Sequence, residues 1–189
     1  VRGAEYLLDN LPALGTRANP LTDALCRDAI PRGLAAIRRL MEDEDAAARD
    51  EMAWVSLCGG LALANAGLGA VHGFAGVLGG ATGAPHGALC GRLLPGVLRA
   101  NARAVAGEGG DLTRHHEVAS WIGAALGETG DPIDLLEARI DAWGLPRLAA
   151  MGVEAFEVAA LAEASRGSSS MRGNPVPLGL ATLEAILHD

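Results

Sequence analysis

Apolar residues recur every three or four positions through most of this 189-residue chain. This is the periodicity of helices that pack one face on a core. In the segment after Asn19, the apolar stripe consists of Leu34, Ile37, Leu40 and Met41. No segment shows the strict apolar–polar alternation that is typical of a half-buried strand. The pattern therefore predicts an all-α protein, a multi-helix bundle with short connections.

Capping and breaking residues divide this pattern into six to eight helices. Asn19-Pro20 predicts a helix start, with Pro31 as a kink before the helix ends near Met41. The acidic run 42–45 suits the N-terminus of a long helix that reaches Ala66. Further helices are expected over 72–78, 86–106, 112–126, 132–143, 152–164 and up to 188. We expect residues 79–85 to form a turn and residues 166–174 to form a loop.

Composition limits the classes of function. Half of the residues are hydrophobic and one fifth are charged, so we expect one well-buried domain over residues 1–189. The net charge of −8 argues against a nucleic-acid partner. No stretch reaches the roughly 18 uninterrupted apolar residues of a membrane span, and the start at Val1 lacks a signal-peptide core. Neither a membrane nor a nucleic acid is therefore an expected partner.

Three cysteines, Cys26, Cys58 and Cys90, occur at wide spacing in apolar helical contexts. We find no close pair and no ligand spacing among them, so we expect three buried free thiols. Such thiols fit a reducing compartment, and we expect a cytoplasmic protein. The His115-His116 pair is expected on a polar helix face as plain surface imidazoles.

The most informative segment is the Gly-rich stretch 69–87, which carries His72 and His86 fourteen positions apart. We expect His72 on a short helix, and His86 follows Ala84-Pro85 at the start of the next one. Two imidazoles from adjacent apolar elements suit a divalent metal site. The alternative is a pair of satisfied core histidines without a ligand.

A longer motif surrounds the two histidines. It reads G-x-V-H-x-x-A-x-x-L-G-G-x-x-x-x-P-H-G from Gly69 and continues through Leu93-Leu94-Pro95 to Asn101. Two further stretches are Ala18-Asn19-Pro20-Leu21-Thr22-Asp23 and Gly173-Asn174-Pro175-Val176-Pro177. In this order they resemble the iron-containing (group III) alcohol dehydrogenases. The likeness covers the C-terminal, helical, metal-binding domain of that dehydroquinate synthase-like fold.

The resemblance implies a divalent metal, iron or zinc, held by one Asp and three His, with His72 and His86 as the two later histidines. It also implies an NAD(P)-binding N-terminal domain, which we expect to be absent from this chain. The helix that should carry the other two ligands has no His. In one register the ligand positions fall at Ala4 and Leu8. In the other they fall at Glu5 and Asp9, one helical turn apart, which we predict as metal ligands; ordinary exposed charges are the alternative.

The resemblance also bears on substrate and activity. Many members of the family carry a His where this chain has Gly76, so a proton relay through that position is absent. We predict that Phe74 and Trp54 line the substrate side of the site. The first hypothesis is the metal- and substrate-binding half of an NAD(P)-dependent dehydrogenase for a small alcohol or carbonyl compound. A cofactor domain would then act in trans, and a homodimer is a further possible assembly. The alternative is a degenerate, non-catalytic module for ligand binding or assembly.

Overall fold

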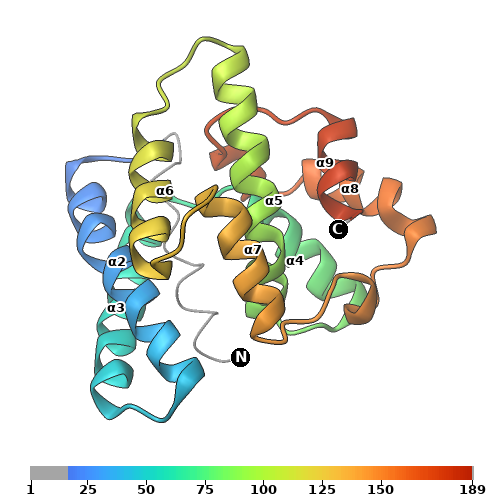
Figure 1. Ribbon diagram of the computed structural model, residues 1–189. Coiled ribbons are helices and arrows are strands. Elements are labelled where there is room, and N and C mark those ends of the chain that lie inside the picture. The colour runs from blue at the N-terminus through green and yellow to red at the C-terminus, as the bar shows by residue number, and fades with distance from the viewer. Residues whose placement is uncertain (1–16, 189) are drawn as a thin grey trace.

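The computed structural model describes residues 17–188, and within this range the chain forms eight α-helices and no strand (Figure 1). They are α2 (Pro20–Glu42), α3 (Ala46–Ala66), α4 (Ala70–Thr82), α5 (His86–Gly107), α6 (Thr113–Leu126), α7 (Pro132–Ala142), α8 (Val158–Arg166) and α9 (Leu180–Leu187). Short 3-10 turns occur at Ala149–Met151 (η2), Ala155–Glu157 (η3) and Met171–Gly173 (η4). The predicted all-α class is confirmed.

The first two of these helices begin where the sequence predicts. The Asn19 side chain accepts hydrogen bonds from the backbone N–H groups of Leu21 and Thr22, and the Thr22 hydroxyl accepts one from the Asn19 N–H. This reciprocal capping box satisfies N–H groups that have no partner inside the helix. Asp45, the last residue of the acidic run, caps α3 by accepting from the N–H of Ala48.

Other boundaries differ from the prediction. Helix α4 begins at Ala70 and continues through Gly79 and Gly80, which we had placed in the turn. The turn is shorter and centres on Gly83, whose φ of 72° is left-handed and therefore favours glycine. The predicted helix over 152–164 is also wrong at its start. A 3-10 turn precedes α8, because Gly152 has a φ of 92° and ends the preceding turn instead.

Helix α5 lies at the centre of the bundle and contacts α4, α7 and α9 (Figure 1). Helices α2 and α3 form a hairpin beside it, and α6 joins the two parts by packing on α2 and on α7. Helix α8 packs on α4 and α9. The buried residues form a main core around α4 and α5 and a smaller cluster between α2 and α3.

Among the described residues, no single helix has the length and hydropathy of a membrane span. Helices α3 and α4 pass that test only as a pair, and they are bent by 102° relative to each other.

Candidate metal centre

The structure brings His72 and His86 together. His72 lies in the first turn of α4 and His86 is the first residue of α5, so the short turn at 83–85 folds the two helices back on each other. The centroids of the two imidazole rings are 5.3 Å apart and the rings are tilted by 50°. Two residues that are fourteen positions apart in sequence thus face one point, as the metal-site prediction requires.

A third donor, Cys90, joins this pair. The candidate ligand atoms of His72, His86 and Cys90 all lie within 4.8 Å of one another, and Cys90 Sγ is 3.5 Å from His86 Nε2. The spacing of the cysteines among themselves could not reveal this donor, because the neighbours of Cys90 in the cluster are histidines. His86 and Cys90 are four residues apart, one helical turn, so both side chains point to the same side of α5. That spacing was readable in the sequence once His86 was placed at a helix start.

The donor set is graded from the core to the surface. Cys90 is fully buried, His72 is half-buried and His86 is exposed. Two imidazoles and a thiol are ligands that zinc and related divalent metals prefer. The exposure of His86 places the outer side of the set at the surface of the described part of the chain. The residues present therefore fit a divalent metal.

Helix α4 is capped from the far end of the chain. Its N-cap residue Gly69 has no side chain to cap it. Instead the Ala70 N–H donates to Asn174 Oδ1 at 3.0 Å. The Asn174 amide donates in turn to Asn101 Oδ1 at 2.6 Å and to the Val176 carbonyl at 2.8 Å. Asn101 lies in the C-terminal part of α5, so one buried asparagine caps the start of α4 and ties it to α5.

The segment around Asn174 approaches the start of α4 so closely that a glycine is required at position 173. A Cβ on Gly173 would clash with the backbone carbonyl oxygen of Leu68, and one on Gly73 would press on the flexible Met171 side chain, whose Cε would be 3.0 Å away. Contacts this short exclude any side chain at Gly173 unless the backbone moves. The matching Gly-Asn-Pro stretch of the sequence therefore supports the metal centre, a role that sequence reasoning did not assign to it.

Helix α5 is held from its other side by Arg92, two residues beyond Cys90. The Arg92 side chain is 1% exposed and its Nη1 donates to Asp141 Oδ1 at 2.7 Å. The guanidinium also donates to the backbone carbonyls of Leu145 and Pro146. A buried guanidinium that satisfies this many acceptors ties α5 to the end of α7.

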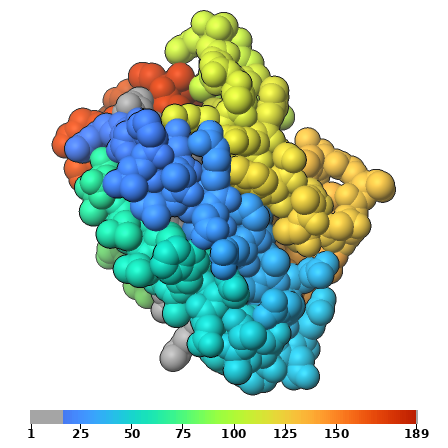
Figure 2. Space-filling model, turned by 90° about the vertical axis from the view of Figure 1, so that its left-hand side faces the viewer, coloured from blue at the N-terminus to red at the C-terminus, as the bar shows by residue number. Residues whose placement is uncertain are grey.

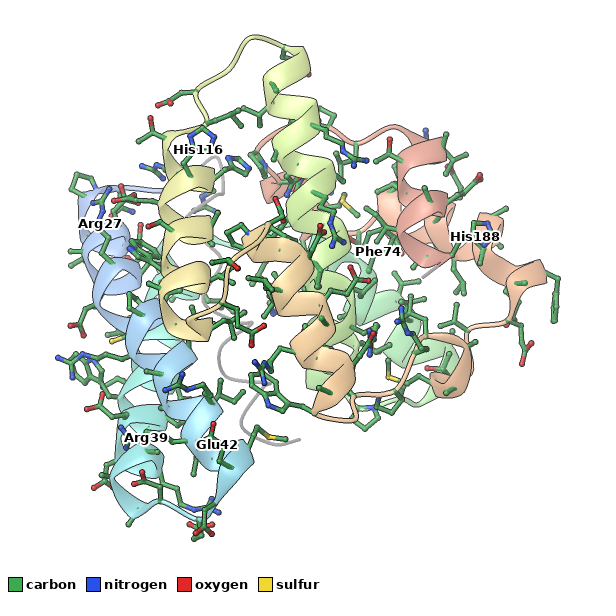
Figure 3. All side chains as sticks on the ribbon, in the orientation of Figure 1. Arg27, Arg39, Glu42, Phe74, His116 and His188 are labelled. Atoms are coloured by element: carbon green, nitrogen blue, oxygen red, sulfur yellow. The ribbon has the colours of Figure 1, made fainter. Side chains whose placement is uncertain are left out.

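The two predicted substrate-side residues lie apart from each other. Phe74 is fully buried, within the body of the molecule in Figure 3. It is two residues after His72 and hence about 200° around α4, which turns it toward the core. Trp54 is 44% exposed on α3, and its Nε1 donates to Asp28 Oδ2 on α2 at 2.7 Å. A role of either in lining a substrate pocket stays a prediction.

Three further positions singled out in the sequence are Glu5, Asp9 and Gly76. Glu5 and Asp9 lie outside the described residues, so their predicted ligation stays a prediction. Gly76, one turn after His72, is exposed, and a Cβ placed there would meet no atom within 4 Å. The His that many relatives are expected to carry at this position would thus find room.

His115 corrects our view of the histidine pair on α6. The sequence predicts two surface imidazoles, and His116 is indeed exposed near the N-terminal end of α6 (Figure 3). Both ring nitrogens of His115, by contrast, are shielded from solvent and have no hydrogen-bond partner among the described residues. Burial lowers the pKa of His115, and the neighbouring His116 lowers it further. The two histidines line a pocket of about 390 Å³ between α5, α6 and α7.

The described part of the chain is a helical domain with a cluster of three candidate metal donors, and comparison with known proteins identifies its family. The C-terminal model of the Fe-containing alcohol dehydrogenase family matches residues 14–189. The chain belongs to this family, as the sequence motifs indicated.

Two curated relatives and one crystal structure show the extent of the match. The chain is 34% identical to lactaldehyde reductase of Escherichia coli (strain K12) over 182 residues, 89% of this chain and 43% of that protein. It is 31% identical to alcohol dehydrogenase 4 of Saccharomyces cerevisiae (strain ATCC 204508 / S288c), over 92% of this chain and 45% of that protein. A crystal structure of 1,3-propanediol oxidoreductase superposes with a TM-score of 0.86 at 27% identity and covers 98% of this chain and 50% of that one.

The chain spans about half the length of the relatives that it matches. Membership of the family implies a divalent metal and the use of NAD(P). The histidine pair and the buried thiol are consistent with the first of these. The helices described here correspond to the C-terminal half of such a protein.

Proposed function

We propose that this chain is the metal- and substrate-binding half of an NAD(P)-dependent alcohol dehydrogenase that acts on a small alcohol or carbonyl compound. The observation that carries the proposal is the convergence of His72 and His86 from α4 and α5, within the family's own motif. The names of the relatives, a lactaldehyde reductase and an alcohol dehydrogenase, support this substrate class. The nicotinamide would come from a separate cofactor-binding part.

In this function His72 and His86 hold the metal through neutral ring nitrogens. A divalent metal in this position supplies Lewis-acid polarisation of an alcohol or carbonyl oxygen. Asn174 keeps His72 in place by capping α4, and the exposed side of His86 leaves an approach for substrate. Gly76 cannot donate or accept a side-chain proton, so proton transfer at that position is left to solvent. Glu5 and Asp9 are proposed as further metal ligands.

The metal content of the chain tests the proposal. The protein is purified without chelator, reconstituted with iron(II) or zinc, desalted and analysed by elemental mass spectrometry. We expect about one metal per chain in the wild type and a loss of most of it in the variant His72→Ala/His86→Ala, because removing two ligands leaves too few donors. His116→Ala removes an exposed histidine outside the cluster and is the matched control. A wild type that retains no metal after reconstitution contradicts the proposal.

A second candidate, a binding or assembly module, is favoured by one feature of α3. Trp54, Leu57 and Leu61 are 44%, 56% and 45% exposed and occupy one face of that helix. Large exposed apolar side chains that share a helix face are typical of interaction surfaces. A cofactor-binding domain in trans or a second copy of the chain could cover them. Analytical ultracentrifugation of the chain, alone and mixed with a cofactor-binding half, distinguishes these assemblies from a monomer.

The three cysteines also bear on where the protein works. Cys26, Cys58 and Cys90 are all buried, and none of them forms a disulfide within the described part of the chain. Free thiols are typical of a reducing compartment, which supports the proposal of a cytoplasmic protein.

A further inference from the structure

We infer that Cys90 is a metal ligand in this protein, so that His72, His86 and Cys90 form a thiolate-containing site that selects zinc over iron. The inference rests on the proposed metal-binding function and adds to it a donor that departs from the oxygen- and nitrogen-only ligand set expected for the family.

The distance between Cys90 and His86 is that of two zinc ligands. Zinc binds imidazole nitrogen at about 2.0–2.1 Å and thiolate sulfur at about 2.3 Å, so the nitrogen–sulfur edge of a tetrahedral site is roughly 3.6 Å long. The structure places Cys90 Sγ 3.5 Å from His86 Nε2. This edge of the coordination polyhedron is therefore already in place, and both atoms are on the same turn of α5.

His72 can complete the set with a small movement of its side chain. The donor atom of His72 lies within 4.8 Å of those of the other two residues. A tetrahedral edge is shorter than this by at most about 1.5 Å, which rotation of an imidazole about its side-chain torsions can supply. His72 is half-buried.

The thiol of Cys90 is placed where a metal ligand would be. Cys90 is fully buried, and its sulfur faces the two imidazoles. The other two buried cysteines, Cys26 and Cys58, belong to no such cluster among the described residues. Without metal, the thiol and His86 are at the distance of a weak hydrogen bond. On binding, a sulfur–metal bond replaces the S–H bond, and the thiol proton leaves to solvent.

The donor set determines which metal is preferred. Thiolate is a soft ligand that favours zinc over hard cations, and sites of nitrogen and sulfur bind zinc more tightly than iron(II) in the general affinity order. The described residues thus supply three donors, as many protein ligands as catalytic zinc commonly has. We therefore expect zinc to displace iron(II) from the wild-type chain when both are supplied at equal concentration.

Cobalt(II) reports directly on sulfur ligation. The full chain is stripped of metal, titrated with cobalt(II), and its absorption recorded for the wild type, Cys90→Ser and the matched control Cys58→Ser. We expect a near-ultraviolet sulfur-to-cobalt charge-transfer band in the wild type and in Cys58→Ser, and its loss in Cys90→Ser. We also expect Cys90→Ser to lower zinc affinity by roughly 100-fold or more, beyond the effect of losing an outer-shell partner.

The outcomes separate this inference from the proposed function. Cobalt d–d bands without a charge-transfer band in the wild type mean that the histidines bind metal without Cys90, which overturns the inference and leaves the metal site standing. A charge-transfer band that persists in Cys90→Ser overturns it as well. Absence of any cobalt binding by the wild type overturns both.

X-ray absorption of the zinc-loaded wild type tests the ligand without a variant, should Cys90→Ser fail to fold. We expect one sulfur neighbour at about 2.3 Å beside nitrogen or oxygen neighbours at about 2.0–2.1 Å. A spectrum fitted without sulfur overturns the inference.

Discussion

The α4–α5 pair and the α2–α3 pair are both helical hairpins, but different contacts hold each of them in place. The α4–α5 pair lies in the main core, where Asn174 and Arg92 tie it to distant parts of the chain. The α2–α3 pair has a small cluster of its own, composed of Ala29, Ala36, Ala48, Met52, Val55 and Cys58. Figure 2 shows α2 and α3 side by side on the surface, with α6 next to them.

The exteriors of the two hairpins differ as well. Ion pairs on α2 and α3, such as Arg32 with Glu51, are solvent-exposed, and such pairs add little stability. The α4–α5 pair instead uses buried hydrogen bonds whose loss leaves polar groups without partners. Two of these buried contacts lie close to the donors: Asn174 binds the start of α4 beside His72, and Arg92 is two residues from Cys90.

The largest expected effect is on the free energy of unfolding, and it distinguishes the main core from the α2–α3 cluster. Phe74→Ala removes a fully buried aromatic ring from the main core, and we expect it to lower the free energy of unfolding by about 3–5 kcal/mol. Val55→Ala, in the α2–α3 cluster, removes less buried surface, and we expect about 2 kcal/mol. Urea denaturation measures both. Equal losses for the two variants would contradict the distinction between the cores.

The next effect tests the cap of α4. Asn174→Ala leaves the Ala70 N–H and the Asn101 side chain without a partner, and we expect a loss of about 2–3 kcal/mol of unfolding free energy. Because α4 carries His72, zinc affinity should fall as well. As a control, Asn65→Ala removes an exposed asparagine of α3 that only donates to the Leu61 carbonyl. Undiminished zinc affinity in a folded Asn174→Ala would show that the cap does not position His72.

A smaller effect concerns pH. Burial holds the pKa of His115 below its ordinary value of 6.5. At a pH above 6.5, the His115 imidazole is neutral in both the folded and the unfolded chain. As the pH falls below 6.5, the unfolded chain binds a proton at His115 while the folded chain stays neutral there. The free energy of unfolding should therefore fall with acidification, until the pH passes the lowered pKa of the folded state.

The variant His115→Gln should show a shallower fall in stability between about pH 7 and pH 5 than the wild type, since it lacks this proton uptake. His116→Gln, which alters the exposed neighbour, is the matched control. Parallel pH profiles for the wild type and His115→Gln would contradict the burial of a neutral imidazole.

The smallest effect is expected on the exposed face of α3. Leu57 is 56% exposed, so Leu57→Gln should change the free energy of unfolding by no more than about 0.5 kcal/mol. A larger loss would show that this face is covered in the folded chain.

The sequence predicted most helices because their signals are local. The Asn19 cap, the long helix to Ala66 and the helix start at His86 all depend on residues within one or two turns. Gly79 and Gly80 misled the prediction, because glycine is a helix breaker in isolation but is retained in α4 within a packed hairpin.

The candidate site was predictable only in part. His72 and His86 were found by their apolar setting and by the motif, and the His86–Cys90 spacing could have been read from the helix start. The burial of His115 and the link from Asn174 to Ala70 could not, because they depend on segments that are far apart in sequence.

The long reach of Asn174 has a consequence for how the protein matures. During synthesis, both histidines and Cys90 leave the ribosome well before Asn174 does, so the helix that presents His72 gains this cap only after a further hundred or so residues have been made. Under the proposed function, stable metal loading would then follow the synthesis of the Gly-Asn-Pro segment. A chain that stops short of the Gly-Asn-Pro segment would carry every donor described here and still lack a formed site.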